Sequence, residues 1–302
     1  MSDRRLLVVN LGHLAFSESL EFQRAVSAAR IIGAVPDDVL LLVEHPPVVT
    51  LGRSTKGDNL HISEALLAAR GVERFDIERG GDATFHGPGQ LVGYPIVDLK
   101  RHRQDLHWYL RQVEAALIVA LAGVGLRAGR VTKYTGVWID DRKIASIGVH
   151  ARDWVTRHGF ALNVSTDLSY FDLFTPCGIP DVVMTSVSRE LGDAAPTMPA
   201  MQQLTADAFA TVFDLAVQPT TRDELDVLLA AVPSLSALYG SNAILNGVRT
   251  EAHGHGDGRR NDDEGTGNAQ RRFSLFPSFP ACCLRALAPL GENCCDLDQV
   301  RS

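Results

Sequence analysis

The stretch RGGDATFHGPGQ, residues 79–90, is followed directly by the apolar run LVGYPIVDL, residues 91–99. Four glycines and a proline in twelve residues let the backbone turn tightly and leave amides able to donate to a ligand. Such a loop can hold a phosphate, a carbonyl oxygen or an acyl chain, and a purely structural turn is the alternative. Its glycine spacing matches neither the P-loop nor the dinucleotide-binding motif. His86 in this loop is a candidate acid, base or hydrogen-bonding brace.

Outward from this loop, apolar β-branched runs alternate irregularly with segments of helical periodicity. This order of strands and helices predicts the fold class: one α/β domain with a mixed sheet. Ser17 is a candidate N-cap of the first helix. The strands are expected at residues 6–10, 39–44, 48–51, 75–79, 91–99, 136–140, 143–149 and 158–164, and the helices at 17–32, 63–70, 105–122 and 200–215.

The composition limits the classes of function. The chain has 302 residues, a hydrophobic content of 45% and a net charge of −7, which favour a globular protein and argue against a general nucleic-acid binder. No apolar run reaches the roughly 18 residues of a membrane span, and the first residues do not resemble a signal peptide. We therefore expect no membrane association and a cytoplasmic location.

The C-terminal part has a different texture from the rest. Residues 246–272 are rich in Gly, Asn, Asp, Glu and Arg with almost no apolar spacing. We predict a catalytic domain over residues 1–238 and a disordered extension over residues 239–302. Four of the five cysteines lie in that extension as two adjacent pairs, which lack the spacing of a zinc site. No metal and no cofactor are predicted.

Lysine is rare: of 29 basic residues, only four are lysines. Arginine keeps its charge, whereas burial can tune a lysine into a base or a nucleophile. Lys143 begins the second strand of a predicted hairpin in DDRKIASIGVH. If it points inward beside a thiol, its charge favours the thiolate. The alternative is a solvated hairpin lysine beside Asp140 and Asp141.

Cys177 is the single cysteine outside the C-terminal extension. It lies in FTPCGIPDVVMTS, between a proline and a glycine that break regular structure. A thiol on such a turn is open to a substrate, although an isolated cysteine is more often a small core residue. Both interpretations remain open from these residues alone.

Three blocks together resemble a known family. RGGDATFHGPGQLVGYP, RKIASIGVHARDWVTRHGFALNV and TPCGIPDVVMTSVSRELG look like the signature blocks of the lipoyl (octanoyl) transferases, and the similarity runs over about residues 6–213. The resemblance implies a single domain similar to the catalytic domains of biotin and lipoate protein ligases. It also implies transfer of an octanoyl group from acyl carrier protein to a lysine of a lipoyl domain, through an acyl-cysteine thioester.

The resemblance also implies roles for individual residues and partners. Cys177 matches the acyl-accepting cysteine and Lys143 the lysine that activates it. The implied acceptors are the lipoyl domains of 2-oxoacid dehydrogenase complexes and the glycine cleavage H protein. Apolar side chains around Phe85, Leu91 and Phe160 are candidate walls for an eight-carbon chain. The implied substrate-binding residues are Arg79, Gly80, Gly81, Asp82, Ala83, Thr84, Phe85, His86, Ser146, Ile147, Gly148, Gly159, Phe160 and Ala161.

Three rival functions follow from the same residues. An ATP-dependent lipoate or biotin ligase would need a nucleotide and would not need Cys177. A Cys-His hydrolase would pair Cys177 with His86 or His150 and use water as the acceptor. A non-catalytic carrier-binding module would keep Cys177 as a core residue.

Charge suggests where an acidic carrier protein would dock. Residues 127–157 contain seven basic residues and three acidic ones, a local charge of +4. We therefore predict that this segment forms a basic face for the carrier.

Overall fold

The computed structural model of the chain describes residues 4–55, 63–174 and 182–230. Cys177, the predicted domain boundary near residue 238 and the extension over residues 239–302 lie outside these ranges. Within them, no helix is both long enough and apolar enough to cross a membrane.

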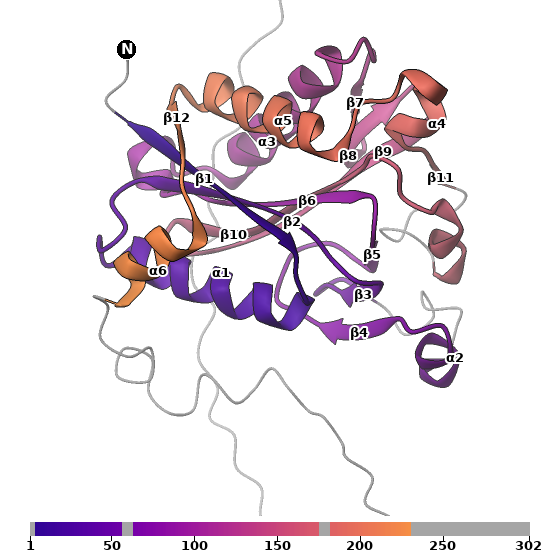
Figure 1. Cartoon of the computed structure of the whole chain (residues 1–302), viewed down its shortest axis with the longest axis horizontal. Helices are drawn as coiled ribbons and strands as arrows, with labels where there is room; N and C mark the ends of the chain where they lie inside the picture. Colours follow the sequence, from indigo (N-terminus) through magenta and orange to yellow (C-terminus); the bar gives the residue numbers. More distant parts are fainter. Residues whose placement is uncertain (1–3, 56–62, 175–181, 231–302) are drawn as a thin grey trace, which may run out of the picture. The chain divides into compact units, whose positions relative to one another are not determined.

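A mixed sheet forms the centre of the domain (Figure 1). In the described residues its strand order is β12-β1-β2-β6-β10-β9-β8-β7, and β11 pairs with β9. β1 runs parallel to β2 and β12, whereas β6, β10, β9, β8 and β7 follow in antiparallel steps. The strands are β1 (Arg5–His13), β2 (Asp38–Glu44), β6 (Gln90–Ile96), β7 (Gly129–Val131), β8 (Tyr134–Ile139), β9 (Arg142–Arg152), β10 (Val155–Asn163), β11 (Val183–Met184) and β12 (Ala216–Pro219).

Helices cover both faces of this sheet. On one face, α3 (Leu106–Ala122) and α5 (Met198–Phe213) pack together, and on the other lie α1 (Phe16–Ile31) and α6 (Arg222–Ala230), as Figure 1 shows. Leu40 and Leu42 of β2 join the core on the α3 side, whereas Val39 and Leu41 join the core on the α1 side. A strand buried on both faces has no polar side, which explains the continuous apolar run of β2.

A second, smaller sheet has the order β4-β3-β5. Its strands are β3 (Val48–Leu51), β4 (Glu73–Asp76) and β5 (Thr84–His86). β5 comes from the Gly-rich stretch, so this sheet places that stretch beside the central sheet. The remaining elements are α2 (Glu64–Ala69), α4 (Val187–Leu191) and the short 3-10 helices η2 (Leu99–Arg101), η3 (Leu168–Leu173) and η5 (Gly192–Ala194).

The predicted α/β class with a mixed sheet is confirmed, as is the hairpin of β8 and β9, although its turn lies at Asp140 and Asp141 and not at the expected Asp141 and Arg142. Two other local predictions were wrong. The first helix begins at Phe16 with Ala15 as N-cap and no side-chain cap, because Phe16 is anchored in a buried cluster with Leu20 and Val48. The strand expected at residues 75–79 is β4, which ends at Asp76. β5, β7, β11 and β12 were not predicted.

The paired central strands β6 and β10 need a glycine at Gly93. Gly93 lies opposite Phe160, and a Cβ atom on Gly93 would stand 2.1 Å from the Cζ atom of that ring. We expect Gly93→Ala to lower the free energy of unfolding by about 2 kcal/mol, because the Phe160 ring would have to leave its stacked position on Phe209, at 5.3 Å between centroids. Gly129→Ala in β7 is the matched control, since nothing lies within 4 Å of its Cβ position. Urea unfolding of both variants tests the difference; equal stabilities would contradict it.

Candidate functional site

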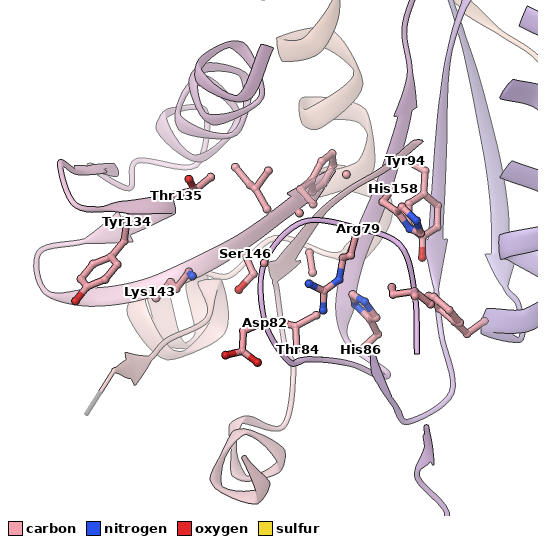
Figure 2. A pocket seen from close by; sticks show the side chains of 18 of the residues that line it. Arg79, Asp82, Thr84, His86, Tyr94, Tyr134, Thr135, Lys143, Ser146 and His158 are labelled. Carbon is pink, nitrogen blue, oxygen red and sulfur yellow. The ribbon is translucent and has the colours of Figure 1, made fainter. Parts of the chain in front are cut away.

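A cavity of about 190 Å³ lies where the Gly-rich stretch meets the central sheet (Figure 2). Its lining comes from the four neighbouring strands β8, β9, β10 and β6, from residues 77–86, from Phe16 at the start of α1, and from Lys133 just before β8. A cavity of about 150 Å³ can hold benzene, so this one suits a ligand with a comparable or slightly larger number of carbon atoms.

The Gly-rich loop crosses β9 at very short range. The Gly80 amide donates to the Val149 carbonyl at 2.9 Å. A Cβ atom on Gly148 would lie only 2.8 Å from the Gly80 carbonyl oxygen, so this approach requires a glycine there. The Arg79 guanidinium donates to the backbone carbonyl of Thr50 at 2.8 Å and to its hydroxyl at 3.0 Å. The loop is thereby fixed to both sheets.

The alternation of β5 decides which of its side chains reach the cavity. Thr84 and His86 line it, whereas Phe85 does not. Phe85 points to the opposite side and stacks on Tyr170, with 4.4 Å between the ring centroids. Successive side chains of a strand face opposite ways, so Phe85 belongs to a neighbouring core. Leu91 likewise packs in the core on the α3 side, so of the three walls expected for an acyl chain, only Phe160 lines the cavity.

Lys143 is buried on β9 and lines the cavity, with 1% of its surface exposed. The β8–β9 register shifts between Val137 and Trp138, and Trp138 pairs with Lys143. Such a bulge changes the direction of nearby side chains. The Lys143 ammonium lies 5.5 Å from the centroid of the Trp138 ring, a distance at which a cation is attracted to the ring face. The alternative of a solvated hairpin lysine is therefore wrong.

Gly136 makes room for this lysine. Its φ is 138°, and a Cβ atom there would lie 2.8 Å from Cε of Lys143. The Gly136 amide donates to the buried carboxylate of Glu114 at 3.1 Å. The same carboxylate accepts from Arg111 at 2.6 Å and from Arg130 at 2.8 Å. Glu114 therefore joins α3 to β7 and β8 behind Lys143.

A chain of buried amides fixes the proton on His86. The Thr185 carbonyl can only accept, so Nδ2 of Asn163 donates to it at 3.0 Å. Oδ1 of Asn163 then accepts from Nε2 of Gln90 at 2.9 Å, which leaves Oε1 of Gln90 to accept from Nδ1 of His86 at 2.9 Å. Burial is the largest cause, and the nearby His45 the second, that lower the pKa of His86 to about 3. The ring is therefore neutral near pH 7, with its hydrogen on Nδ1.

His45 is neutral for the same physical reason. Its Nδ1 donates to the Leu14 carbonyl at 2.6 Å, so its Nε2 is the acceptor that receives the Tyr94 hydroxyl at 2.8 Å. Burial lowers the pKa of His45 to about 4. His158, which lines the cavity, also has a pKa lowered by burial, and among the described residues its Nε2 has no hydrogen-bond partner.

The structure brings most of the predicted site together. Eleven of the fourteen predicted substrate-binding residues line the cavity with Lys143, and the exceptions are Gly80, Ala83 and Phe85. Cys177 lies outside the described residues. Sequence reasoning missed seven lining residues, of which only Lys133 had a signal, the scarcity of lysine. The seven are Phe16, Ile77, Tyr94, Lys133, Tyr134, Thr135 and His158.

Three of the seven basic residues in the predicted basic face are paired with distant carboxylates, whereas Arg127 and Lys133 are exposed, so carrier docking there stays a prediction. Arg130 is paired with Glu114 at 2.8 Å, Arg142 with Glu190 at 2.9 Å, and Arg157 with Glu78 at 3.0 Å. Lys143 faces the cavity. These carboxylates are distant in sequence, so the local charge of residues 127–157 did not reveal them. In the described ranges, no group of three His, Cys, Asp or Glu side chains is placed to hold a metal ion.

The fold and the cavity define a class: a mixed α/β domain with a cavity of small-molecule size beside a buried lysine. The family model described as the lipoyl protein ligase A/B catalytic domain matches residues 16–210, and the chain belongs to this family. The octanoyltransferase of Solibacter usitatus is 46% identical over 216 residues, which are 72% of this chain and 96% of that protein.

A second relative is the octanoyltransferase of Myxococcus xanthus, 48% identical over 215 residues. These are 69% of this chain and 60% of that protein, so the chain spans less than two thirds of its length. The resemblance to octanoyltransferases seen in the three sequence blocks is thereby confirmed.

The fold has solved counterparts. The bipartite lipoate protein ligase of the lipoylation system of Thermoplasma acidophilum matches with a TM-score of 0.58 at 15% identity. The match covers 75% of this chain and 91% of that one. At this identity the likeness shows the fold alone, and it confirms the predicted similarity to lipoate protein ligase domains.

The two neutral histidines predict how stability depends on pH. An unfolded histidine titrates near 6.5, whereas His45 and His86 stay unprotonated down to about 4 and about 3. Below pH 6.5 the unfolded chain therefore binds more protons, and stability falls as the pH falls. Between pH 7 and pH 5 each of the two histidines should lower the free energy of unfolding by about 2 kcal/mol, since a full difference of one proton changes it by about 1.4 kcal/mol per pH unit. His86→Gln should reduce the measured loss by about that amount.

Urea unfolding at both pH values provides the measurement. His107→Gln, at an exposed position of α3, is the control and should leave the loss as in the wild type. A His86→Gln variant with the full wild-type loss would show that His86 does not contribute to it.

Proposed function

We propose that the protein transfers an octanoyl group from acyl carrier protein to the acceptor lysine of lipoyl domains, through a thioester on Cys177. The observation that carries the proposal is the buried Lys143 beside an acyl-sized cavity, in a chain close to half identical to octanoyltransferases. A cytoplasmic setting and acceptors in 2-oxoacid dehydrogenase complexes and the glycine cleavage system are part of the same proposal.

The proposed reaction has two balanced steps. The Cys177 thiolate attacks the octanoyl carbonyl, the carbon–sulfur bond to the carrier's phosphopantetheine breaks, and the departing thiolate takes a proton. The amine of the acceptor lysine then attacks the Cys177 thioester, an amide forms, and the Cys177 thiolate leaves. Exchange of one thioester for another is close to neutral in free energy, so no ATP is needed.

Lys143 is proposed as the group that moves the protons. A lysine can gain and lose a proton, whereas an arginine stays charged. Lys143 would take the proton from the Cys177 thiol, give it to the departing carrier thiol, and later take one from the attacking amine. The chain that follows Cys177 supports this pairing, because Met184 of β11 pairs with Lys143 and the Thr185 amide donates to the Lys143 carbonyl at 2.9 Å.

The Cys-His hydrolase is less well supported. His86 uses Nδ1 to bind Gln90, and a pKa of about 3 makes it a weak base near pH 7. His150, on β9, does not line the cavity. Neither histidine offers what a hydrolytic dyad requires.

Intact-protein mass spectrometry tests the thioester. After mixing with octanoyl acyl carrier protein, without ATP or Mg²⁺, we expect a mass gain of one octanoyl group that hydroxylamine removes. Cys177→Ala should show no such adduct and no transfer, which also separates Cys177 from the four C-terminal cysteines. A wild-type protein that stays unmodified, or that needs ATP, would rule out the proposed mechanism.

Replacement of Lys143 tests its role. Lys143→Arg keeps a positive charge but cannot cycle a proton, so transfer should fall by about 100-fold or more. Lys100→Arg is the matched control, because Lys100 is partly exposed near Asp98 and is not among the cavity residues. Rates of octanoyl transfer to a lipoyl domain compare the two. Near-normal transfer by Lys143→Arg would leave Lys143 with an electrostatic role only.

A further inference from the structure

We propose that the closed end of the cavity, formed by Phe16, Ile77 and Tyr94, sets the longest acyl chain that the protein accepts, with Phe16 as the principal stop. The proposal rests on the proposed function and adds a specificity determinant to it. None of the three residues was among the predicted substrate-binding residues, and Phe16 and Ile77 lie outside the three sequence blocks.

Burial shows which end of the cavity is closed. Lys133 and Thr135 line it and are exposed, so this end is the mouth. Phe16 and Tyr94 line it with 1% and 3% of their surface exposed. In Figure 2, Lys143 and Tyr134 lie on one side of the cavity and Tyr94 on the opposite side, with Ser146 between. A chain whose carbonyl lies near Lys143 therefore extends toward the closed end.

The length of an octanoyl group can be compared with the separation of Lys143 and Tyr94. Seven C–C bonds of about 1.5 Å advance about 1.25 Å each in an extended chain, which gives about 9 Å. The strand registers place Tyr94 across β10 from Gly148, five residues along β9 from Lys143, so the two backbone positions are about 10 Å apart across the sheet and about 17 Å apart along it. An eight-carbon chain spans about half of this separation, the two side chains occupy part of the rest, and each further methylene brings the chain closer to the closed end.

Contacts on the side away from the cavity keep Phe16 and Tyr94 in position. The Phe16 ring stacks on His86 at 6.0 Å between centroids and meets His45 edge-on at 5.5 Å. His45 is bound to the Leu14 carbonyl and to the Tyr94 hydroxyl. Displacement of Phe16 or Tyr94 would break buried hydrogen bonds or ring contacts. The free energy lost in this way exceeds the free energy gained by burying one more methylene group of the ligand.

Phe16, Ile77 and Tyr94 themselves carry no charge, and the guanidinium of Arg79, which also lines the cavity, is bound to the Gly80 and Thr50 carbonyls. His86, beside Phe16, is neutral because burial lowers its pKa, and its Nδ1 is directed to Gln90. Ile77 packs with Phe16 in one apolar cluster. An alkyl terminus therefore meets ring faces and aliphatic carbon, and the restriction on length is steric.

The test is a competition in one tube between octanoyl, decanoyl and dodecanoyl acyl carrier protein for the acyl-enzyme. Intact mass gives the ratio of adducts, and this ratio is independent of the fraction of folded protein. In the wild type we expect octanoyl to dominate. In Phe16→Ala the ratios of decanoyl and dodecanoyl to octanoyl should rise about tenfold or more, since one methylene in an apolar pocket changes selectivity by about 10-fold to 200-fold.

Phe22→Ala is the matched control. Phe22 lies on the same helix α1 and is 6% exposed, but it packs in the core and does not line the cavity. Its ratios should equal those of the wild type. If Phe16→Ala does not fold, Phe16→Leu provides the milder enlargement. Ile77→Phe adds volume, so with hexanoyl acyl carrier protein added to the mixture the ratio of hexanoyl to octanoyl adduct should rise.

Unchanged ratios in both Phe16 variants, or equal increases in the Phe16 and Phe22 variants, would overturn the proposal. Native mass spectrometry of the binding of free fatty acids with six to fourteen carbons distinguishes a failure of the length limit from a failure of the proposed function. If no thioester forms but Phe16→Ala or Phe16→Leu extends the longest fatty acid bound, the transfer mechanism fails and the length limit stands. If the bound series does not change, the length limit fails.

Discussion

The contact on which the site depends is the close crossing of the Gly-rich loop over β9. One hydrogen bond, from the Gly80 amide to the Val149 carbonyl, holds the loop, and the missing side chain of Gly148 allows it. Because β5 follows the loop and belongs to the second sheet, this contact fixes the distance between the two sheets. The cavity is the space that remains between them. A bulkier residue at position 148 would move the loop and, with it, Thr84 and His86.

The imidazoles at and behind the cavity wall are neutral, although Arg79, Asp82, Lys133 and Lys143 also line the cavity. The Leu14 carbonyl accepts from Nδ1 of His45 and so fixes the hydrogen of that ring. The Thr185 carbonyl does the same for His86, through Asn163 and Gln90. Burial keeps these rings neutral, since a charged group is costly to remove from water without compensation. An apolar ligand is therefore compatible with walls that contain imidazoles. Lys143 differs from these imidazoles in that it is a buried lysine, at 1% exposure, in the cavity wall.

The fold class could be predicted because its signals are local, whereas most of the cavity residues were predicted from the resemblance to a family. Continuous apolar runs identify strands buried on two faces, and the glycines of residues 79–90 indicate close backbone approach. The sequence did not reveal that Phe85 faces away, because the three-residue β5 was hidden in an apparent loop. It did not identify Phe16, Ile77 or Tyr94 either, because a wall residue has the same apolar signal as a core residue. Only packing brings these three elements to one place.

The two ends of the cavity are therefore built by different parts of the chain. At the Lys143 end, main-chain geometry of β8 and β9 and the buried Glu114 position one ionisable group. At the other end, rings from α1 and β6 close the space. The fold is shared with a lipoate protein ligase at 15% identity, so this framework of sheets and helices tolerates extensive change in its side chains. The length of the acyl chain that fits and the groups at the Lys143 end can therefore change separately, since each end of the cavity is built from different side chains.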